Sequence, residues 1–394
     1  MSILERIGFM KKDSRSVIFD IGTASVGGAY IRSENNLPHI LYHGRWQSTV
    51  DDFDNFERYF THTLDGLADM GGKITGWKGY KRPGHVACFL PSILYVSEIR
   101  TITFRSEKPR KITPELIEEI ITEDLQTLSV NMDFGERIPG EKPVFIAREI
   151  IGFKLNGYTT EYPYGKTASE IKVIIFLAYT SHAVIKRLKE KILTIINVES
   201  IEFYGTVYAV YKIIGKYFAD EKNFILYNVT GEVAELLIVR AGKLSKIVSY
   251  PFGTRTLVRR FRDRMKINYA EGETLLKLYI EGGINRHHKE KVEEALLIVK
   301  REWKVSLSLV FDRISGHIPL PSKIFIANAG IYSDFLKNWF LNERRELLLP
   351  EKDLSVYVLK ENFLIQNFYI SNQDYTDDVV LVLEAIFTNE KNLV

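Results

Sequence analysis

The most constraining feature of the sequence is a strand–turn–strand unit that occurs twice. Near the beginning of the chain, the small-residue turn 20–25 lies between two β-rich runs within 17–31. After about residue 220 the pattern restarts, with the turn 228–232 between two β-rich runs within 224–240. Each unit predicts a β-hairpin. A repeat of this length predicts two duplicated lobes rather than a solenoid.

Length and composition favour a multidomain protein of the reduced cytoplasm. The chain has 394 residues, of which 45% are hydrophobic, and its 53 basic and 50 acidic residues give a net charge of +3. Because this balance leaves no large basic excess, we expect no nucleic-acid partner. Cys88 is the single cysteine, so an internal disulfide framework is excluded. The sequence shows no secretory signal and no membrane-spanning run.

The order of expected elements divides the chain into lobes with an insertion. In the first half, a third strand at 40–46 and a helix at 51–69 follow the hairpin. Strands at 94–99 and 100–104 then begin a separate α/β block, whose helix has Thr113 as its N-cap and Pro114 in its first turn. We expect a leader at 1–13, a first lobe at 14–91 plus 194–220, an inserted subdomain at 92–193, a second lobe at 221–265 plus 320–394, and a helical subdomain at 266–319.

The first turn carries the residues best suited to hold a phosphate. Gly22 has no Cβ to block the approach of a phosphate to backbone N–H groups. Thr23 and Ser25 add hydroxyl donors, and Asp20 at the strand end can hold a magnesium ion through water. An ordinary Asx-type turn would show the same residues, so the motif alone leaves both interpretations open.

The motifs together resemble a known superfamily. Asp20-Ile21-Gly22-Thr23 with its duplicated hairpin resembles actin, the sugar kinases and the heat-shock chaperones. The run 111–115 before an acidic helix resembles the extra subdomain shared by FtsA and PilM, and 154–173 looks more like FtsA. The resemblance implies an α/β, two-lobed actin-like ATPase fold, with duplicated RNase-H-like domains and an inserted FtsA/PilM-type α+β subdomain.

This resemblance implies a cleft that binds ATP and Mg²⁺ between the lobes. The implied nucleotide-binding residues are Asp20, Gly22, Thr23, Ser25, Asn228, Gly231, Glu273, Lys277, Ala329 and Gly330, and Asp20 is also the implied contact of the metal. The second hairpin departs from the family pattern, because Asn228 replaces an aspartate and Glu232 brings a carboxylate toward the phosphates. We therefore expect weak ATP hydrolysis or none.

The implied role is a bacterial scaffold at the inner face of the cell membrane. The favoured hypothesis is an FtsA-like cell-division protein that binds ATP, self-assembles and links the tubulin-like FtsZ filament to the membrane. A PilM-like adaptor, bound to the tail of a pilus-assembly membrane protein, is the first alternative, and an active small-molecule kinase or ATPase is the second. Ile3, Leu4, Ile7 and Met10 share one helical face near basic residues and form a candidate membrane anchor. A leader without fixed structure is the other interpretation of this segment.

Overall fold

This computed structural model of the chain describes residues 14–34, 37–48, 55–131, 138, 142–315, 319–328, 330–345, 347, 349, 354–360 and 378–391. Some predicted features lie outside the described residues: the leader at 1–13, the anchor residues Ile3, Leu4, Ile7 and Met10, and the cleft residue Ala329.

The first sheet of the described chain has five strands in the order β3-β2-β1-β4-β9. An antiparallel meander of β1 (Ser14–Ile21), β2 (Ser25–Glu34) and β3 (Leu37–Gln47) is extended in parallel by β4 (His85–Leu90) and β9 (Ser200–Gly205). Val17, Ile18 and Phe19 are fully buried. They form a continuous apolar run because helices cover both faces of this sheet.

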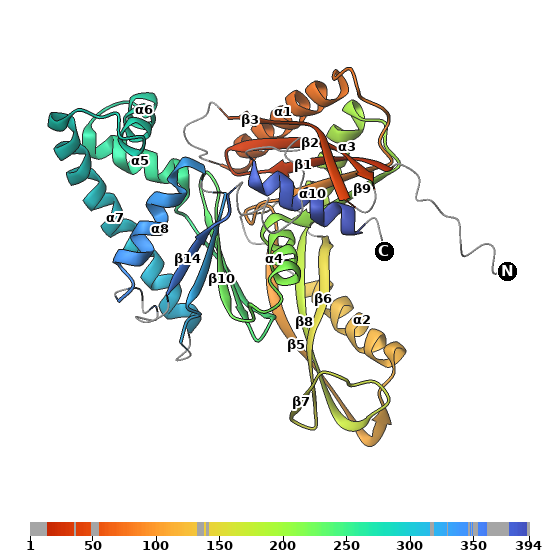
Figure 1. The fold of residues 1–394 in the computed structure, drawn as a ribbon. Coiled ribbons are helices and arrows are strands. Elements are labelled where there is room, and N and C mark those ends of the chain that lie inside the picture. Colours follow the sequence, from red (N-terminus) through yellow and green to blue (C-terminus); the bar gives the residue numbers. More distant parts are fainter. Residues whose placement is uncertain are drawn as a thin grey trace.

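Four helices cover the first sheet (Figure 1). Helices α1 (Phe56–Thr75) and α3 (His182–Ile195) pack together on one face, and α4 (Thr206–Tyr217) packs with α10 (Val379–Lys391) on the other. The sequence assigned residues 320–394 to the second lobe, but α10 lies on the first sheet instead. Its side chains from Val380 to Phe387 are buried there, so the first sheet needs this returning helix to complete its core.

The second sheet repeats the strand order of the first. Its described strands run β12-β11-β10-β13-β14, where β10 (Phe224–Val229), β11 (Ala234–Arg240) and β12 (Lys243–Tyr250) form the meander and β13 (Lys323–Ala327) and β14 (Ser355–Val358) add in parallel. The predicted duplication of the hairpin and third strand is therefore confirmed, and the two sheets make a two-lobed α/β fold.

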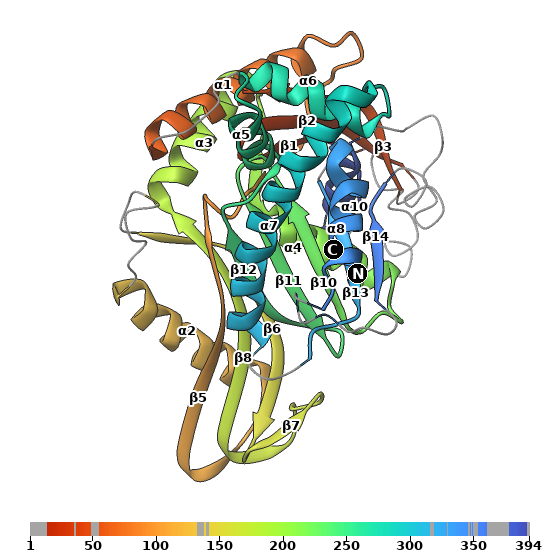
Figure 2. The ribbon, with the colours of Figure 1, turned by 90° about the vertical axis from the view of Figure 1, so that its left-hand side faces the viewer.

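The helices of the second half complete a separate core. They are α5 (Thr254–Met265), α6 (Tyr269–Ile280), α7 (Arg286–Ser315) and α8 (Ser333–Asn342), with a 3-10 turn at Gly330–Tyr332. Figure 2 shows α7 running across this lobe. Trp303 of α7 is fully buried and donates a hydrogen bond of 3.1 Å from Nε1 to the hydroxyl of Tyr227. No helix among the described residues is long and apolar enough to cross a lipid bilayer.

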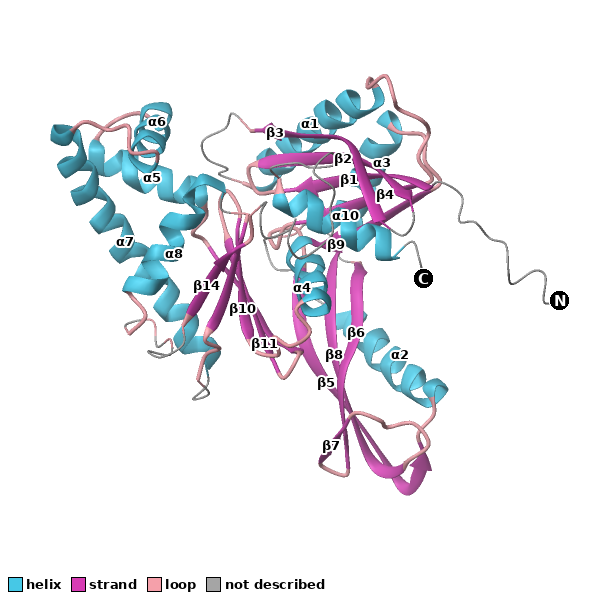
Figure 3. Ribbon diagram, viewed as in Figure 1, coloured by secondary structure: helices cyan, strands magenta, loops and turns pink. Residues whose placement is uncertain are grey.

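A third sheet projects from the first lobe (Figure 3). Its described strands run β5-β8-β6-β7, from β5 (Val96–Lys111), β6 (Pro143–Leu155), β7 (Tyr158–Thr160) and β8 (Thr167–Ser181), beside α2 (Pro114–Asn131). The predicted N-cap is present, since the Thr113 hydroxyl accepts the Leu116 N–H at 3.2 Å. The two strands expected at 94–99 and 100–104 are one, β5, because no turn residue interrupts its pairing with β8 there.

Candidate functional site

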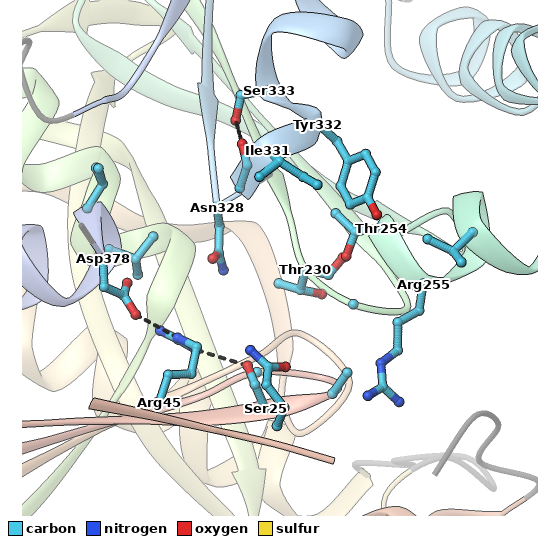
Figure 4. A pocket seen from close by; sticks show the side chains of 18 of the residues that line it. Ser25, Arg45, Thr230, Thr254, Arg255, Asn328, Ile331, Tyr332, Ser333 and Asp378 are labelled. Atoms are coloured by element: carbon cyan, nitrogen blue, oxygen red, sulfur yellow. Dashed lines mark hydrogen bonds and ion pairs between the residues drawn. The ribbon is translucent and has the colours of Figure 1, made fainter. Parts of the chain in front are cut away.

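A cavity of about 1090 Å³ lies between the two lobes and takes its lining from both. Figure 4 shows side chains of β2 and β3 facing those that follow β10 and β13. Several predicted residues line the cavity, namely Gly22, Ser25, Gly231, Glu273 and Gly330. Others do not line it, namely Asp20, Thr23, Asn228 and Lys277.

Asp20 lies just behind the cavity wall and is held by an arginine that sequence reasoning missed. Its side chain is 1% exposed, and its Oδ2 accepts a 2.6 Å hydrogen bond from Nη2 of Arg45. Nε of Arg45 donates to Oδ2 of Asp378 at 2.6 Å, and Nη1 donates to Oγ of Ser25 at 2.9 Å. At the start of α4, Oγ1 of Thr206 lies 3.4 Å from Oδ1 of Asp20. One guanidinium thus joins β1, β2 and the start of α10.

Strand register brings these groups together. Asp20 pairs with Gly27 on β2, and Gly27 pairs with Arg45 on β3. Directly paired residues share one face of a sheet, so the Asp20 and Arg45 side chains can meet above Gly27. A Cβ at position 27 would lie 2.7 Å from Nη2 of Arg45 and 2.9 Å from its Cζ. A side chain at position 27 would therefore displace the guanidinium from this position.

Asp20 is buried, and it is electrostatically coupled to the half-buried Arg45 and Asp378. Burial raises the pKa of Asp20, and the charge of Arg45 opposes that shift. Burial opposes the charge of Arg45, but Asp378 and Asp20 outweigh it and raise the pKa of the guanidinium. Glu384 of α10 is also fully buried, and burial together with the charge of Asp20 raises its pKa well above the usual range.

The Mg²⁺ predicted at Asp20 does not fit this arrangement. One oxygen of Asp20 is bound by Arg45 and the other faces the hydroxyl of Thr206. A magnesium ion needs a carboxylate oxygen that can coordinate it directly or accept a hydrogen bond from one of its waters. Within the described ranges, no three His, Cys, Asp or Glu side chains are grouped to hold a metal. A guanidinium stands where the metal was expected.

The second hairpin turns its first polar residue into the protein. Asn228 is fully buried, and its Nδ2 donates a 2.7 Å hydrogen bond to Oε2 of Glu235, its direct ladder partner on β11. Burial raises the pKa of Glu235 despite this hydrogen bond. Glu232, expected near a phosphate, pairs through both oxygens with Arg259 of α5. The second hairpin therefore presents no unpaired carboxylate to the cavity from Glu232 or Glu235.

The two hairpin turns contact each other directly. Oγ1 of Thr23 lies 2.9 Å from Oγ1 of Thr230 and accepts the N–H of Glu232 at 2.7 Å. Since the Thr230 hydroxyl also lies 2.9 Å from the Val233 carbonyl, Thr230 donates to that carbonyl and Thr23 donates to Thr230. A Cβ at Gly231 would lie 2.4 Å from that of Ala24. Thr23, a predicted phosphate-binding residue, joins the two lobes through these contacts.

The far end of the cavity is built from the second lobe. Asn328 and Gly330 line it and adopt left-handed backbone conformations, with φ of 60° and 54°. Tyr269 and Tyr332 add aromatic walls. Within the described part of the chain, the buried hydroxyl of Tyr332 has no hydrogen-bond partner. Glu273 of α6, a predicted nucleotide-binding residue, lines this end, whereas Lys277, one turn later, does not.

Comparisons with solved structures give matches along almost the whole chain. A PilM–PilN type IV pilus biogenesis complex aligns with a TM-score of 0.60 and 12% identity, covering 96% of this chain and 98% of that chain. The ethanolamine utilization protein EutJ from Carboxydothermus hydrogenoformans aligns with a TM-score of 0.47 and 11% identity, covering 97% of this chain and 93% of that chain. A Bacteroides thetaiotaomicron protein with an actin-like ATPase fold aligns with a TM-score of 0.40 and 11% identity, covering 97% and 98%.

Sequence comparisons add no family. No protein-family model matches the sequence, and no curated protein matches it. The chain has the actin-like ATPase fold, as its resemblance to that superfamily implied, and at 12% identity the likeness to the PilM chain concerns the fold alone.

Proposed function

We propose that this chain is an adaptor of the actin-like fold that binds a partner protein without running a cycle of ATP hydrolysis. The observation that carries the proposal is the position of Arg45 between Asp20 and Asp378. Phosphoryl transfer depends on metal ions that neutralise charge developing on the phosphates. A carboxylate already held by a guanidinium is a poor place for such an ion, and Asn228 at the second hairpin cannot replace it.

A nucleotide is proposed here as a ligand rather than as a substrate. The cavity of about 1090 Å³ is large enough for an adenine nucleotide. Gly231, Gly330 and the hydroxyl of Tyr332 would face it. A ligand in this cavity would contact both lobes and so could favour their closed arrangement.

For the partner, we favour a pilus-assembly adaptor similar to PilM. The alignment with the chain of the PilM–PilN complex covers 98% of that chain, and its TM-score is 0.60. A partner of the PilN kind, a short cytoplasmic tail of a membrane protein, is therefore our first candidate. An FtsA-like division scaffold is the second, favoured by the segment 154–173, which forms the projecting end of the third sheet (Figure 3).

Two measurements on the purified chain test these proposals. We expect no phosphate release from Mg·ATP above a protein-free control, and binding of a synthetic tail peptide from the cognate pilus membrane protein in a titration. Turnover at ordinary kinase rates would overturn the adaptor proposal in favour of an enzyme. Co-sedimentation with FtsZ filaments without binding of the tail peptide would replace the pilus role with the division role.

A further inference from the structure

We infer that the guanidinium of Arg45 takes the place of a divalent metal ion in the cleft and makes the stability of the first lobe independent of metal. This inference concerns the stability of the chain and does not depend on which partner it binds. It rests on the contacts of one side chain with three elements of the fold.

The guanidinium is fixed by its contacts rather than resting on the surface. Arg45 and Asp378 are each 19% exposed, and Asp20 is 1% exposed. The Nε and Nη2 donors that bind these two carboxylates lie on one edge of the planar guanidinium. The two carboxylates therefore lie side by side, facing a single positive group.

Asp378 is itself held in place from a second direction. Its Oδ1 accepts the N–H of Leu381 at 3.3 Å and its carbonyl accepts the N–H of Val382 at 3.2 Å, so it caps the first turn of α10. Arg45 therefore ties the beginning of α10 to the sheet it covers. In a metal-dependent protein, a cation bridging the two carboxylates would make the same connection.

The chemistry left after removal of Arg45 suits a hard divalent cation. Asp20 and Asp378 would then both lose the guanidinium that they share, and carboxylate oxygens are the ligands that Mg²⁺ and Ca²⁺ prefer. The fully buried carboxyl of Glu384 lies beside Asp20, close enough for a hydrogen bond between the two carboxyl groups. Because Arg45 also lines the cavity, a metal ion could enter from it.

The decisive experiment asks whether removal of Arg45 makes the melting temperature depend on a divalent metal ion. We expect the melting temperature of the wild-type protein in EDTA to be unchanged by millimolar Mg²⁺ or Mn²⁺. The Arg45→Ala variant should melt lower in EDTA, and Mg²⁺ should raise its melting temperature by at least about 2 °C, increasing with the logarithm of metal concentration. Adding Asp378→Asn to that variant should abolish the increase.

The controls separate this effect from general stabilisation by salt. Arg148→Ala removes an arginine that pairs with Glu118 at 2.8 Å on the inserted subdomain, and its melting temperature should not respond to metal. Arg45→Lys keeps a cation and should stay independent of metal. If Arg45→Ala does not fold in EDTA, recovery of folded protein in 10 mM Mg²⁺ supports the inference and no recovery overturns it. Stabilisation of the wild type by Mg²⁺ alone, or a folded Arg45→Ala variant that ignores metal, would also overturn it.

Discussion

Several polar residues expected to meet a phosphate make contacts with other side chains of the same chain. Asp20 is bound by Arg45, and Asn228 is bound by Glu235. The Asn228 amide cannot neutralise a cation, and the carboxyl beside it is fully buried. A carboxyl in such a place is costly when ionised, so Glu235 ties the stability of the second hairpin to pH.

The pH dependence follows from the direction of the Glu235 shift. Burial raises its folded pKa above the unfolded value of 4.5. Its contribution to stability is therefore fully present below that value and is lost as pH rises through the folded pKa. In denaturant melts between about pH 5 and pH 8, the wild type should lose more stability with rising pH than Glu235→Gln, which cannot ionise.

The pKa values of Asp20 and Glu384 are also raised, so the stability of Glu235→Gln should still depend on pH to some extent. The exposed Glu107 supplies a matched control, and Glu107→Gln should follow the wild-type profile. Parallel profiles for the wild type and Glu235→Gln would show that Glu235 does not hold its proton in the folded protein.

The sequence identified Asp20 but could not identify Arg45, and the reason is a single bulge. From the end of the second hairpin strand, Glu34 pairs with Leu37, so regular pairing would place Gly44 opposite Gly27. A register shift between Tyr30 and Ile31 moves the pairing by one residue and brings Arg45 there instead. Contiguous motifs can be read along the chain, whereas a cross-strand contact depends on such irregularities.

At the scale of elements, local patterns predicted both hairpins and the capped helix of the inserted subdomain, but the predicted lobe boundaries assigned the last helix to the wrong sheet. An apolar helix can complete either of two similar sheets, and nothing in its own residues distinguishes them. In the structure α10 packs beside α4 on the first sheet. The contact between Arg45 and Asp378 fixes its start, and aromatic packing fixes its end.

Phe387 tests how much the first lobe depends on α10. Its ring centroid lies 5.0 Å from that of Tyr204 and 5.9 Å from that of Phe89, and the side chain is 3% exposed. Truncating such a residue leaves a cavity, so Phe387→Ala should lower the free energy of unfolding by about 3–5 kcal/mol. Urea denaturation followed by circular dichroism measures this loss.

Leu309→Ala on α7 is the matched control, because Leu309 is also a large apolar side chain but is 66% exposed. Its effect should lie within about 0.5 kcal/mol of zero. An equally small effect of Phe387→Ala would mean that α10 adds little to the core of the first lobe.

At the scale of the whole molecule, the two hairpins meet across an interval of about two hundred residues. The sequence indicated that both turns exist and that they correspond to each other. It could not indicate that they touch, because the separation of two lobes is decided by a few contacts rather than by local propensity. The contacts between Thr23 and Thr230 and between Thr23 and Glu232 decide it here.

Removing the Thr23 hydroxyl should loosen the lobes without changing the shape of the side chain. Thr23→Val leaves the N–H of Glu232 and the hydroxyl of Thr230 without this buried partner, at a cost of about 1–3 kcal/mol. We expect faster hydrogen exchange at residues 230–233 and a larger radius of gyration in solution scattering. Exchange within β10 should stay slow, because its ladder is untouched.

Thr23→Ser keeps the hydroxyl and should exchange like the wild type, which separates the hydrogen bonds from the packing of the methyl group. If Thr23→Val exchanges as slowly as Thr23→Ser, the lobes are held by other contacts, and the hydroxyl is only one of several. If exchange at residues 230–233 is faster in Thr23→Val alone, the Thr23 hydroxyl connects the two hairpins. A bound phosphate was expected to make that connection. Closure of the cleft would then be a property of the folded chain itself.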